Sequence, residues 1–516
     1  MNRTFHIRYT SDIHGHFFPT DYATTEPKNI GLMRLMSEYP HDKNTLILDG
    51  GDSLQGSALT NFYERLSEDE KHLLFPDGFL HPVSAIMNMA GYQYVTLGNH
   101  DFNYGLKELN TYLQHLNAVC LCANIVDKAG KLPIQPYAIH TLENGLRIGL
   151  VGVCTHYVRV WEKPETLQQL QIRDAFETAR DLYPEVRSQC DFTILLYHGG
   201  YECDLNTGVR LSNGSENQAY EMCTALDYDL VLTGHQHIAM PGQFIHDTYT
   251  VQPPFRAQGV CAIDVTPGTE GAAFTSTILP ADHEPDPKAM AFLKPLEERI
   301  QHWLDFPAGH LESPLPYVPH LTAALHGSLV ANFINTVQLA LSGAQISTCA
   351  LPNEYKGFSE HPTIRDIVST YIYSNTLVVL EITGAGLKQY IERSSEYFDF
   401  DNGVINYSPE FMRPKVQHYN YDYFSGIDYV IDVSKPIGSR VLSIQYDGRE
   451  IKPEETFSLC INSYRHSGAG EYSMLPDLPV LKDIQEDVAD AIIEYILSHP
   501  EVHIDRHRYS TILPVT

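Results

Sequence analysis

The stretch Tyr94-Val-Thr-Leu-Gly-Asn-His-Asp101 decides the fold, because a short apolar run ends there in a glycine followed by three polar side chains. Four other runs end in the same way, at Asp12-Ile-His14, Gly51-Asp52, His198-Gly-Gly200 and Gly234-His-Gln-His237. Strands that end in Gly-rich turns can present their last side chains into a shared crevice. We therefore expect five strands of one sheet to bring these polar groups together.

The polar groups at these strand ends form a mixed set of metal donors. Two carboxylates, one amide and four histidines remain when His100 is set aside: Asp12, His14, Asp52, Asn99, His198, His235 and His237. Hard oxygen atoms mixed with imidazole suit Mn, Fe, Co, Ni or Zn. Seven donors are too many for one tetrahedral ion and are natural for two. The sequence therefore predicts a hydrolytic site with two divalent metal ions.

Spacing supports this interpretation at two pairs of residues. Asp12 and His14 are two apart, as are His235 and His237, so each pair can lie on one side of an extended chain and hold one ion. A surface strand with two polar residues facing water gives the same spacing. Asp52 follows a glycine pair and can bridge two cations, although an aspartate in a turn also fits the sequence Gly-Asp.

Gly98-Asn-His-Asp101 is the most specific of the five clusters. Asn99 can bind a metal through its amide oxygen without adding charge. His100 is not needed as a ligand and can act as a general acid for a leaving oxygen. We expect Asp101 to orient the His100 imidazole, as an outer carboxylate does for many histidines.

Composition limits the class of partner. The 516 residues contain 35 basic and 64 acidic side chains, a formal charge of −29, and no basic block. This balance argues against a nucleic-acid polymer or an anionic membrane surface, both of which need a positive footprint. We find neither an apolar stretch near the ~20 residues that span a bilayer nor a signal-peptide core, so we expect a cytoplasmic chain. Nine scattered cysteines indicate buried, reduced thiols.

The chain divides into two regions joined by a proline-rich segment. Residues 1–282 alternate short β-branched runs with amphipathic stretches, which predicts a layered α/β domain. Residues 283–320 hold several prolines around one amphipathic piece, Met290 to Trp303, and predict a linker helix. Residues 321–516 predict a second α/β domain. Its expected helices lie near Leu329–Leu341 and Ile364–Tyr371 and along an apolar face from Ile484 to Ile496.

The ordered motifs D-x-H, G-D, G-N-H-D, H and G-H-x-H resemble those of the calcineurin-like metallophosphoesterases over roughly the first 280 residues. The resemblance implies a sandwich of two β-sheets flanked by helices, with a dinuclear centre at the strand ends. It also implies that Asp12, His14, Asp52 and His237 hold one metal and that Asp52, Asn99, His198 and His235 hold the other. His100 is then the catalytic histidine beside the phosphate.

The second region resembles the C-terminal domain of the 5′-nucleotidases and of the 2′,3′-cyclic-nucleotide 2′-phosphodiesterases. In these families that domain clamps the nucleotide base between two aromatic rings. The matching segments are Asn420–Ile427 and Asn462–Tyr472, so we expect Phe424 and Tyr472 to form the clamp, with Tyr421 as a substitute for Phe424. Every base has a π face, so stacking alone does not name the base.

The resemblance to the cyclic phosphodiesterases rests also on Thr363-Ile-Arg-Asp366 and Thr383-Gly-Ala385. The 5′-nucleotidases carry an Asn-Gly-Gly-Ile-Arg type stretch, where this chain reads Ala350-Leu-Pro-Asn-Glu-Tyr-Lys-Gly357. We therefore expect a 2′,3′-cyclic-nucleotide 2′-phosphodiesterase that also acts as a 3′-nucleotidase. The alternatives are a 5′-nucleotidase or UDP-sugar hydrolase and, outside enzymes, a nucleotide-binding or scaffold module with a vestigial metal site.

Overall fold

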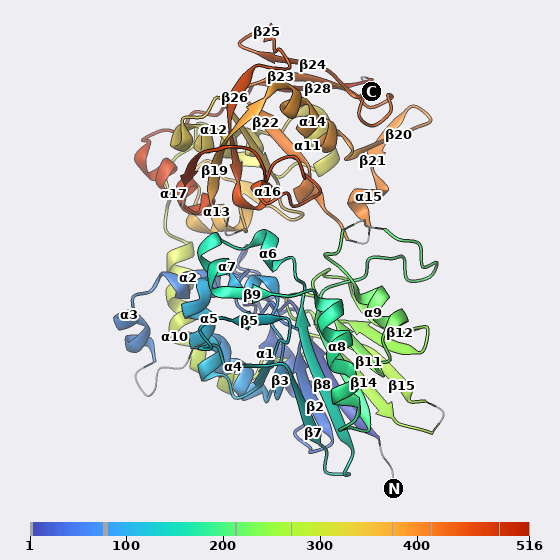
Figure 1. Ribbon diagram of the computed structural model, residues 1–516. Coiled ribbons are helices and arrows are strands. Elements are labelled where there is room, and N and C mark those ends of the chain that lie inside the picture. The colour runs from blue at the N-terminus through green and yellow to red at the C-terminus, as the bar shows by residue number, and fades with distance from the viewer. Residues whose placement is uncertain are drawn as a thin grey trace. The chain divides into compact units, whose positions relative to one another are not determined.

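The computed structural model describes residues 4–75, 81–211, 214–269, 271–373, 375–413, 415–484 and 486–514. The chain divides into two units, Met1–Ile300 and Gln301–Thr516 (Figure 1). The finer limits expected from the sequence, 1–282, 283–320 and 321–516, stay a prediction.

The first unit contains two large mixed sheets. The seven-stranded sheet has the order β15-β14-β1-β2-β3-β4-β6. Its strands are β1 (Phe5–Thr10), β2 (Thr45–Asp49), β3 (Tyr94–Val95), β4 (Val119–Leu121), β6 (Ile134–Gln135), β14 (Gly259–Thr266) and β15 (Ala273–Pro280). From β1 to β6 all neighbours run parallel, so the carboxyl ends of β1, β2 and β3 lie at one edge.

The six-stranded sheet has the order β12-β13-β11-β10-β8-β7. Its strands are β7 (Tyr137–Thr141), β8 (Arg147–Cys154), β10 (Phe192–His198), β11 (Leu230–Thr233), β12 (Met240–Ile245) and β13 (Thr248–Gln252). β8, β10, β11 and β13 run parallel. The polar clusters therefore follow strands of two sheets, and the expectation of a single sheet is wrong.

The two sheets pack face to face around a common apolar core. Ile7 and Leu48 of the first sheet share this core with Leu150, Leu196 and Leu232 of the second, and all five are fully buried. Burying an aliphatic side chain of this size stabilises the fold by ~1.5–3 kcal/mol. The strand ends that carry the polar clusters are fixed relative to one another by this core.

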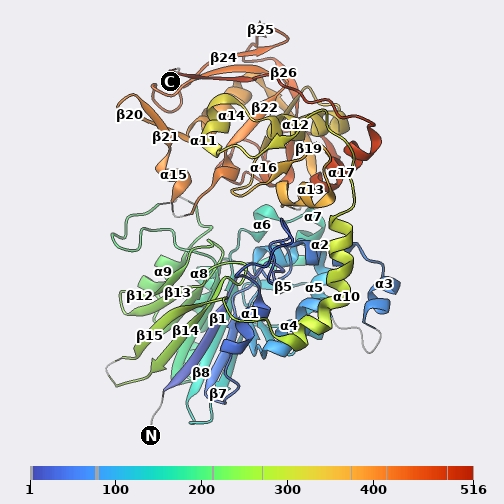
Figure 2. The same ribbon diagram turned by 180° about the vertical axis from the view of Figure 1, so that it is seen from behind.

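Helices cover the outer faces of this sandwich (Figure 2). They are α1 (Leu32–Leu35), α2 (Ala58–Arg65), α3 (Glu68–Leu74), α4 (Pro82–Ala90), α5 (Gly105–His115), α6 (Val158–Trp161), α7 (Pro164–Gln169), α8 (Ala175–Arg187) and α9 (Ala219–Ala225). A small ribbon pairs β5 (Ile125–Asp127) with β9 (Leu170–Ile172). A long helix, α10 (Pro287–Leu304), lies where the sequence predicts a linker helix.

The second unit is built on a five-stranded sheet of order β22-β17-β26-β19-β27 and a four-stranded sheet of order β25-β24-β23-β28. The strands are β17 (Ile346–Ala350), β19 (Leu377–Thr383), β22 (Asp422–Ser425), β23 (Asp428–Asp432), β24 (Val441–Tyr446), β25 (Arg449–Glu450), β26 (Thr456–Asn462), β27 (Val480–Ile484) and β28 (Ser510–Leu513). Two short ribbons pair β16 (Leu315–Pro316) with β18 (Gly357–Phe358) and β20 (Phe398–Asp401) with β21 (Val404–Tyr407).

Among its described residues, the second unit contains the three helices expected from the sequence, which are α12 (Leu329–Ser342), α13 (Ile364–Thr370) and α17 (Val488–Ser498), and four that were not expected. These four are α11 (His320–His326), α14 (Gly384–Ser395), α15 (Pro409–Met412) and α16 (Ser463–His466). The apolar face expected from Ile484 onward is confirmed only from Val488, because Ile484 ends β27 and Asp487 caps α17 by accepting from the Ala489 amide.

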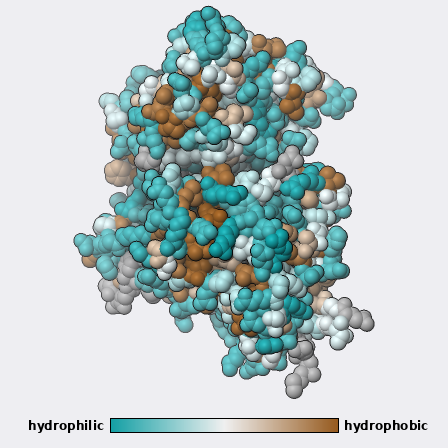
Figure 3. Space-filling model, in the orientation of Figure 1, coloured by the Kyte–Doolittle hydropathy of each residue, from teal (hydrophilic) through white to brown (hydrophobic). Residues whose placement is uncertain are grey.

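All nine cysteines are buried and unpaired, as the sequence predicts. No helix among the described residues combines the length and the apolar character that crossing a membrane requires. The face shown in Figure 3 is mostly hydrophilic and interrupted by smaller apolar groups, in keeping with the acidic composition.

Candidate metal centre and active site

One group of donors comes from the loops that follow β1 and β11. Asp12, His14 and His237 place one possible ligand atom each within 4.8 Å of one another. His14 Nε2 lies 3.0 Å from His237 Nε2, and His237 Nε2 lies 3.5 Å from Asp12 Oδ1. The ring of His237 stacks on Phe255 with centroids 4.6 Å apart, which limits its rotation. These three side chains can hold one ion.

A second group lies beside the first. Asp52, His198 and His235 also place a possible ligand atom each within 4.8 Å of one another. Asp52 Oδ2 is 3.1 Å from His198 Nε2 and 3.9 Å from His14 Nε2, so one carboxylate oxygen faces donors of both groups. This position suits the bridging role that the sequence predicts for Asp52.

The ligand loops have a strained backbone. Five residues of the two groups have φ in the left-handed region that favours glycine: Asp12 at 57°, His14 at 53°, Asp52 at 58°, His235 at 70° and His237 at 57°. Such conformations cost ~1–3 kcal/mol each and persist only where the surroundings enforce them. Backbone hydrogen bonds enforce them here, because the Asp12 amide donates to the Gly51 carbonyl at 2.9 Å and the His14 amide to the Asp52 carbonyl at 2.8 Å.

Two glycines allow the loops after β2 and β3 to touch. A Cβ atom on Gly98 would lie 2.1 Å from Asp52 Oδ1, and one on Gly51 would lie 2.3 Å from the Gly98 amide nitrogen. Gly51 also has φ of 91°. A larger residue at Gly98 would collide with the Asp52 carboxylate, and one at Gly51 would push the two loops apart.

Apart from the 3.1 Å ion pair between Asp52 and His198, three buried atoms at or beside the second group have no hydrogen-bond partner among the described residues. They are Asp52 Oδ2, Asn99 Oδ1 and His198 Nε2. A buried polar atom without a partner is costly and calls for an explanation such as an ion. All three atoms are good ligands for a divalent metal, so the donor set fits the two ions that the sequence predicts.

Backbone carbonyls fix which nitrogen of two histidines faces the site. His14 Nδ1 lies 2.8 Å from the Gln55 carbonyl and His198 Nδ1 lies 2.7 Å from the Gly50 carbonyl. A carbonyl can only accept, so each Nδ1 carries a hydrogen and each Nε2 faces the other donors.

The ionisation of these donors also suits metal binding. Burial lowers the pKa of His14 to about 3 and keeps its ring neutral. Burial also opposes a charge on His198, but the Asp52 carboxylate outweighs it and raises the pKa of His198 to about 10. An ion binding at His198 therefore has to displace a proton.

Asp101 does not orient His100, and this part of the prediction is corrected. The Asp101 carboxylate accepts from four backbone amides, Gly98 and Asp52 at Oδ2 and Ser53 and Leu54 at Oδ1, at 2.8–3.0 Å. It is 1% exposed and ties the loop after β3 to the loop after β2. His100 Nδ1 instead lies 2.8 Å from Asn103 Oδ1.

The predicted base clamp does not fit the structure of the second unit. Phe424, Tyr472 and Tyr421 are 2%, 0% and 2% exposed. Both faces of β22 are covered, and the Tyr472 hydroxyl donates to the Asn420 carbonyl at 2.7 Å. A ring without solvent-facing surface has no face on which a base could stack, so these three residues belong to the core.

Three half-buried tyrosines lie in or around the segments 420–427 and 462–472: Tyr464 in the second segment, Tyr419 directly before the first, and Tyr373 outside both. Tyr419 lies 6.3 Å from Tyr373 and 6.4 Å from Tyr464, centroid to centroid, with the rings at steep angles. Tyr419 and Tyr464 belong to short helical turns, where the alternation that separates inward from outward residues in a strand does not apply. The sequence could therefore not tell which rings in and around these segments keep exposed surface.

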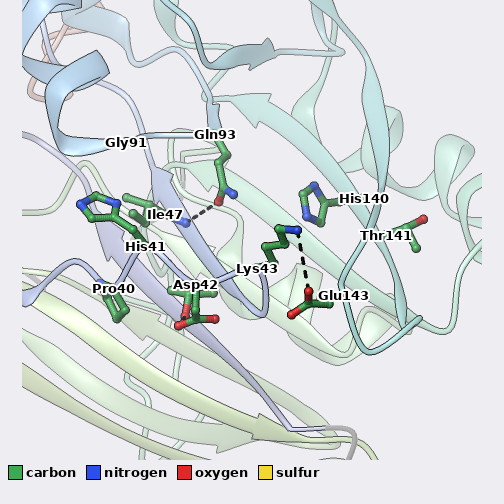
Figure 4. Close-up of a pocket in the computed structure, with 11 residues that line it drawn as sticks. Pro40, His41, Asp42, Lys43, Ile47, Gly91, Gln93, His140, Thr141 and Glu143 are labelled. Carbon is green, nitrogen blue, oxygen red and sulfur yellow. Dashed lines mark hydrogen bonds and ion pairs between the residues drawn. The ribbon is translucent and has the colours of Figure 1, made fainter.

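A hollow of about 550 Å³ lies near the start of β2, remote from the strand ends that carry the donors (Figure 4). Several of its polar groups already have partners. Lys43 pairs with Glu143 at 3.7 Å, and Gln93 accepts from the Ile47 amide at 2.9 Å. We therefore do not assign the active site to this hollow.

Family models match both units. Residues 5–239 match the calcineurin-like phosphoesterase family and residues 307–477 match the 5′-nucleotidase C-terminal domain. Among solved structures, a Staphylococcus aureus protein named as a 5′-nucleotidase and crystallised with alpha-ketoglutarate is 30% identical. Its TM-score is 0.90, and the match covers 99% of either chain.

Curated relatives carry nucleotide phosphoesterase names. A 2′,3′-cyclic-nucleotide 2′-phosphodiesterase/3′-nucleotidase of Salmonella typhimurium is 24% identical over 90% of this chain and 81% of its own. The trifunctional nucleotide phosphoesterase protein YfkN of Bacillus subtilis is 24% identical over 99% of this chain. The match spans 39% of the length of YfkN.

Proposed function

Because the chain belongs to the 5′-nucleotidase family of calcineurin-like phosphoesterases, and is thus a metal-dependent phosphoester hydrolase, we propose that its substrate is a 2′,3′-cyclic nucleotide. The reaction opens the cyclic phosphate to a 3′-nucleotide, which the same site then hydrolyses as a 3′-nucleotidase. The observation that carries the proposal is the meeting of the two donor groups at Asp52 Oδ2.

We assign one ion to Asp12, His14, Asp52 and His237 and the other to Asp52, Asn99, His198 and His235. Bound there, two divalent cations would supply positive charge for the phosphate oxygens and a water of lowered pKa. The buried Asp12, His14, Asp52 and His198 side chains already lie at these positions, and His198 would release a proton when an ion binds.

His100 is the residue that we assign to the leaving oxygen. Its amide donates to Asp52 Oδ1 at 2.7 Å, which holds the residue against the donors, and its ring packs edge-on against His14 at 5.3 Å. The Nδ1 atom faces Asn103, so Nε2 is the atom available to give a proton to the leaving ribose oxygen.

For the base we assign Tyr419 and Tyr464 in place of the buried rings. Both are half-buried, and a tyrosine ring with one exposed face can stack on any base. The names of the cyclic phosphodiesterase relatives favour the cyclic substrate. A 5′-nucleotidase activity is the second candidate, favoured by the name of the Staphylococcus aureus structure.

A substrate panel tests the proposal. The full chain, loaded with Mn²⁺ or treated with chelator, is assayed with 2′,3′-cyclic AMP, 3′-AMP, 5′-AMP and a UDP-sugar. We expect metal-dependent conversion of the cyclic nucleotide to 3′-AMP and then adenosine, with slower release of phosphate from 5′-AMP. Faster turnover of 5′-AMP would establish the second candidate instead, and no metal-dependent turnover of any substrate would refute both.

The matched variant is Asp52→Asn, which keeps the size of the side chain but halves its capacity to bind two cations. We expect it to lower both the metal content and the activity. Wild-type turnover of bis-p-nitrophenyl phosphate by metal-depleted Asp52→Asn protein would contradict the assigned centre.

A further inference from the structure

The side chain of His100 begins a short chain of hydrogen bonds that leads away from the donors. His100 Nδ1 lies 2.8 Å from Asn103 Oδ1, and Asn103 Nδ2 donates to Glu162 Oε1 at 2.5 Å. Glu162 directly follows helix α6, whereas His100 and Asn103 belong to the turn after β3. Two separate segments therefore meet at the Asn103 amide.

The Asn103 amide could turn either of its ends toward His100, because it carries one acceptor and one donor group. Glu162 Oε1 removes this ambiguity. It accepts from Nδ2 whether the carboxyl group is ionised or protonated on its other oxygen, and this directs Oδ1 to the imidazole. An imidazole nitrogen that faces an acceptor carries its hydrogen, so Nδ1 is protonated and Nε2 is left to exchange a proton with the substrate.

A glutamate is unusual at the buried position of Glu162 unless its carboxyl group has a role such as orienting Asn103. It is 7% exposed, and its second oxygen, Oε2, is buried without a hydrogen-bond partner among the described residues. Burial raises the pKa of its carboxyl group. A buried acid with one oxygen unpartnered destabilises a fold compared with an apolar side chain of equal size.

We propose that Glu162 is a positioning residue that acts through Asn103 to fix the tautomer and orientation of His100. This inference rests on the proposed role of His100 as the acid. In that step a hydroxide derived from water would form a new P–O bond while the bond from phosphorus to the ribose oxygen breaks. The leaving oxygen keeps the electron pair of that bond and takes the proton from His100 Nε2. The neutral imidazole that remains is still held by Nδ1 on Asn103.

Two substrates with different leaving groups test this proposal on the Mn²⁺-loaded full chain. The nitrophenolate of bis-p-nitrophenyl phosphate departs without a proton, whereas the ribose oxygen of 2′,3′-cyclic AMP is far more basic and needs one. We expect Glu162→Met, which keeps the volume but removes the acceptor, to lower kcat on the cyclic nucleotide by ~10-fold or more at nearly constant KM. Turnover of the nitrophenyl ester should change less than about twofold.

Two conservative changes extend the test. Glu162→Gln keeps an acceptor oxygen and should recover most of the activity lost in Glu162→Met. Asn103→Asp alone sets a carboxylate against the Glu162 carboxyl group and should be impaired. Asn103→Asp combined with Glu162→Gln restores the chain, because the new aspartate accepts from His100 and the new glutamine donates to the aspartate. The control Glu165→Gln, on the exposed side of α7, should match the parent protein.

Each outcome shows whether Glu162 positions His100 or only fills space in the core. Equal loss of both activities in Glu162→Met, or no loss of either, would overturn the positioning role, as would a double variant no better than Asn103→Asp. Melting temperatures show whether a variant is merely unfolded, in which case the Glu162→Gln and double variants carry the test. A parent protein that hydrolyses neither substrate would instead refute the proposed function itself.

Discussion

Replacing Asp101 by asparagine should damage the fold of the ligand loops. At pH 8 the Asp101 carboxyl group is ionised, since burial raises its pKa only to about 6. Its two oxygens accept four buried backbone N–H groups. Asparagine keeps one of the oxygens, so two of the four N–H groups would face an NH₂ group instead of an acceptor.

The size of the effect follows from those two lost acceptors. A buried N–H without an acceptor costs ~1–3 kcal/mol, so two cost ~2–6 kcal/mol. Each kcal/mol lowers the melting temperature of a domain of roughly 150–250 residues by ~2–4 °C. We therefore expect Asp101→Asn to lower the melting temperature of the chelator-treated protein by roughly 5–20 °C.

The assay is thermal unfolding with chelator present, so that lost metal does not contribute. Asp127→Asn is the matched control, because Asp127 also accepts three backbone amides, Ala129, Lys131 and Leu132, but at the surface, where water can replace it. We expect it to cost less than ~1 kcal/mol. If Asp101→Asn melted like the parent and only lost activity, Asp101 would act on catalysis and not on the loop.

Three further predictions concern His100, the tyrosine pair and Glu64. His100→Asn should keep its metals but slow hydrolysis of the cyclic nucleotide by ~10²–10⁴-fold, and metal analysis with kinetics would reveal any loss of ions instead. The double variant Tyr419→Ala, Tyr464→Ala should raise KM for nucleotides and leave the hydrolysis of bis-p-nitrophenyl phosphate unchanged. Phe424→Ala should instead lower the free energy of unfolding by ~3–5 kcal/mol. If Phe424→Ala raised KM at unchanged stability and the double variant did not, the clamp predicted from the sequence would be restored. Burial and the charge of a neighbouring glutamate raise the pKa of Glu64 from 4.5 to about 7, so the folded protein favours the protonated carboxyl group. The stability that goes with this protonated form is fully present below pH 4.5 and is lost as the pH rises through 7. Glu64→Gln should therefore stabilise the protein at pH 8 by about 1–2 kcal/mol, a value reduced for partial exposure, and have little effect at pH 4, as urea unfolding of both proteins would measure.

The sequence predicts the candidate metal donors better than it predicts the strand pairing and the backbone conformation that position them. Asp12, His14 and Asp52 could be found because glycines and apolar runs mark the ends of strands. The sheet to which each strand belongs could not be found, since pairing depends on contacts between distant segments such as β10 and β8. The left-handed backbone at the ligands could not be predicted at these positions, because aspartate and histidine are only enriched in this conformation and mostly adopt others.

The sequence was least able to assign roles where neighbouring residues in a short segment could each fill the same role. Asp101 stands next to His100 in sequence, yet its carboxylate turns to the backbone, and the residue two further on reaches the ring. Phe424 and Tyr472 are conspicuous aromatic residues in the right segments, but the core takes them and leaves Tyr419 and Tyr464 half-buried. In both cases the direction of a side chain decides its role, and direction is a property of packing.

The division of the ligands between two sheets has a consequence for how the protein matures in the cell. Asp12 and His235 are 223 positions apart, so a growing chain has made both of their loops only after most of the first unit has left the ribosome. Neither sheet alone supplies a complete set of ligands for either ion. With the ligands assigned above, metal uptake would come after the two sheets have docked and would then tie them together. In a cell short of metal, newly made chains would be docked by the apolar core alone and would be more readily degraded.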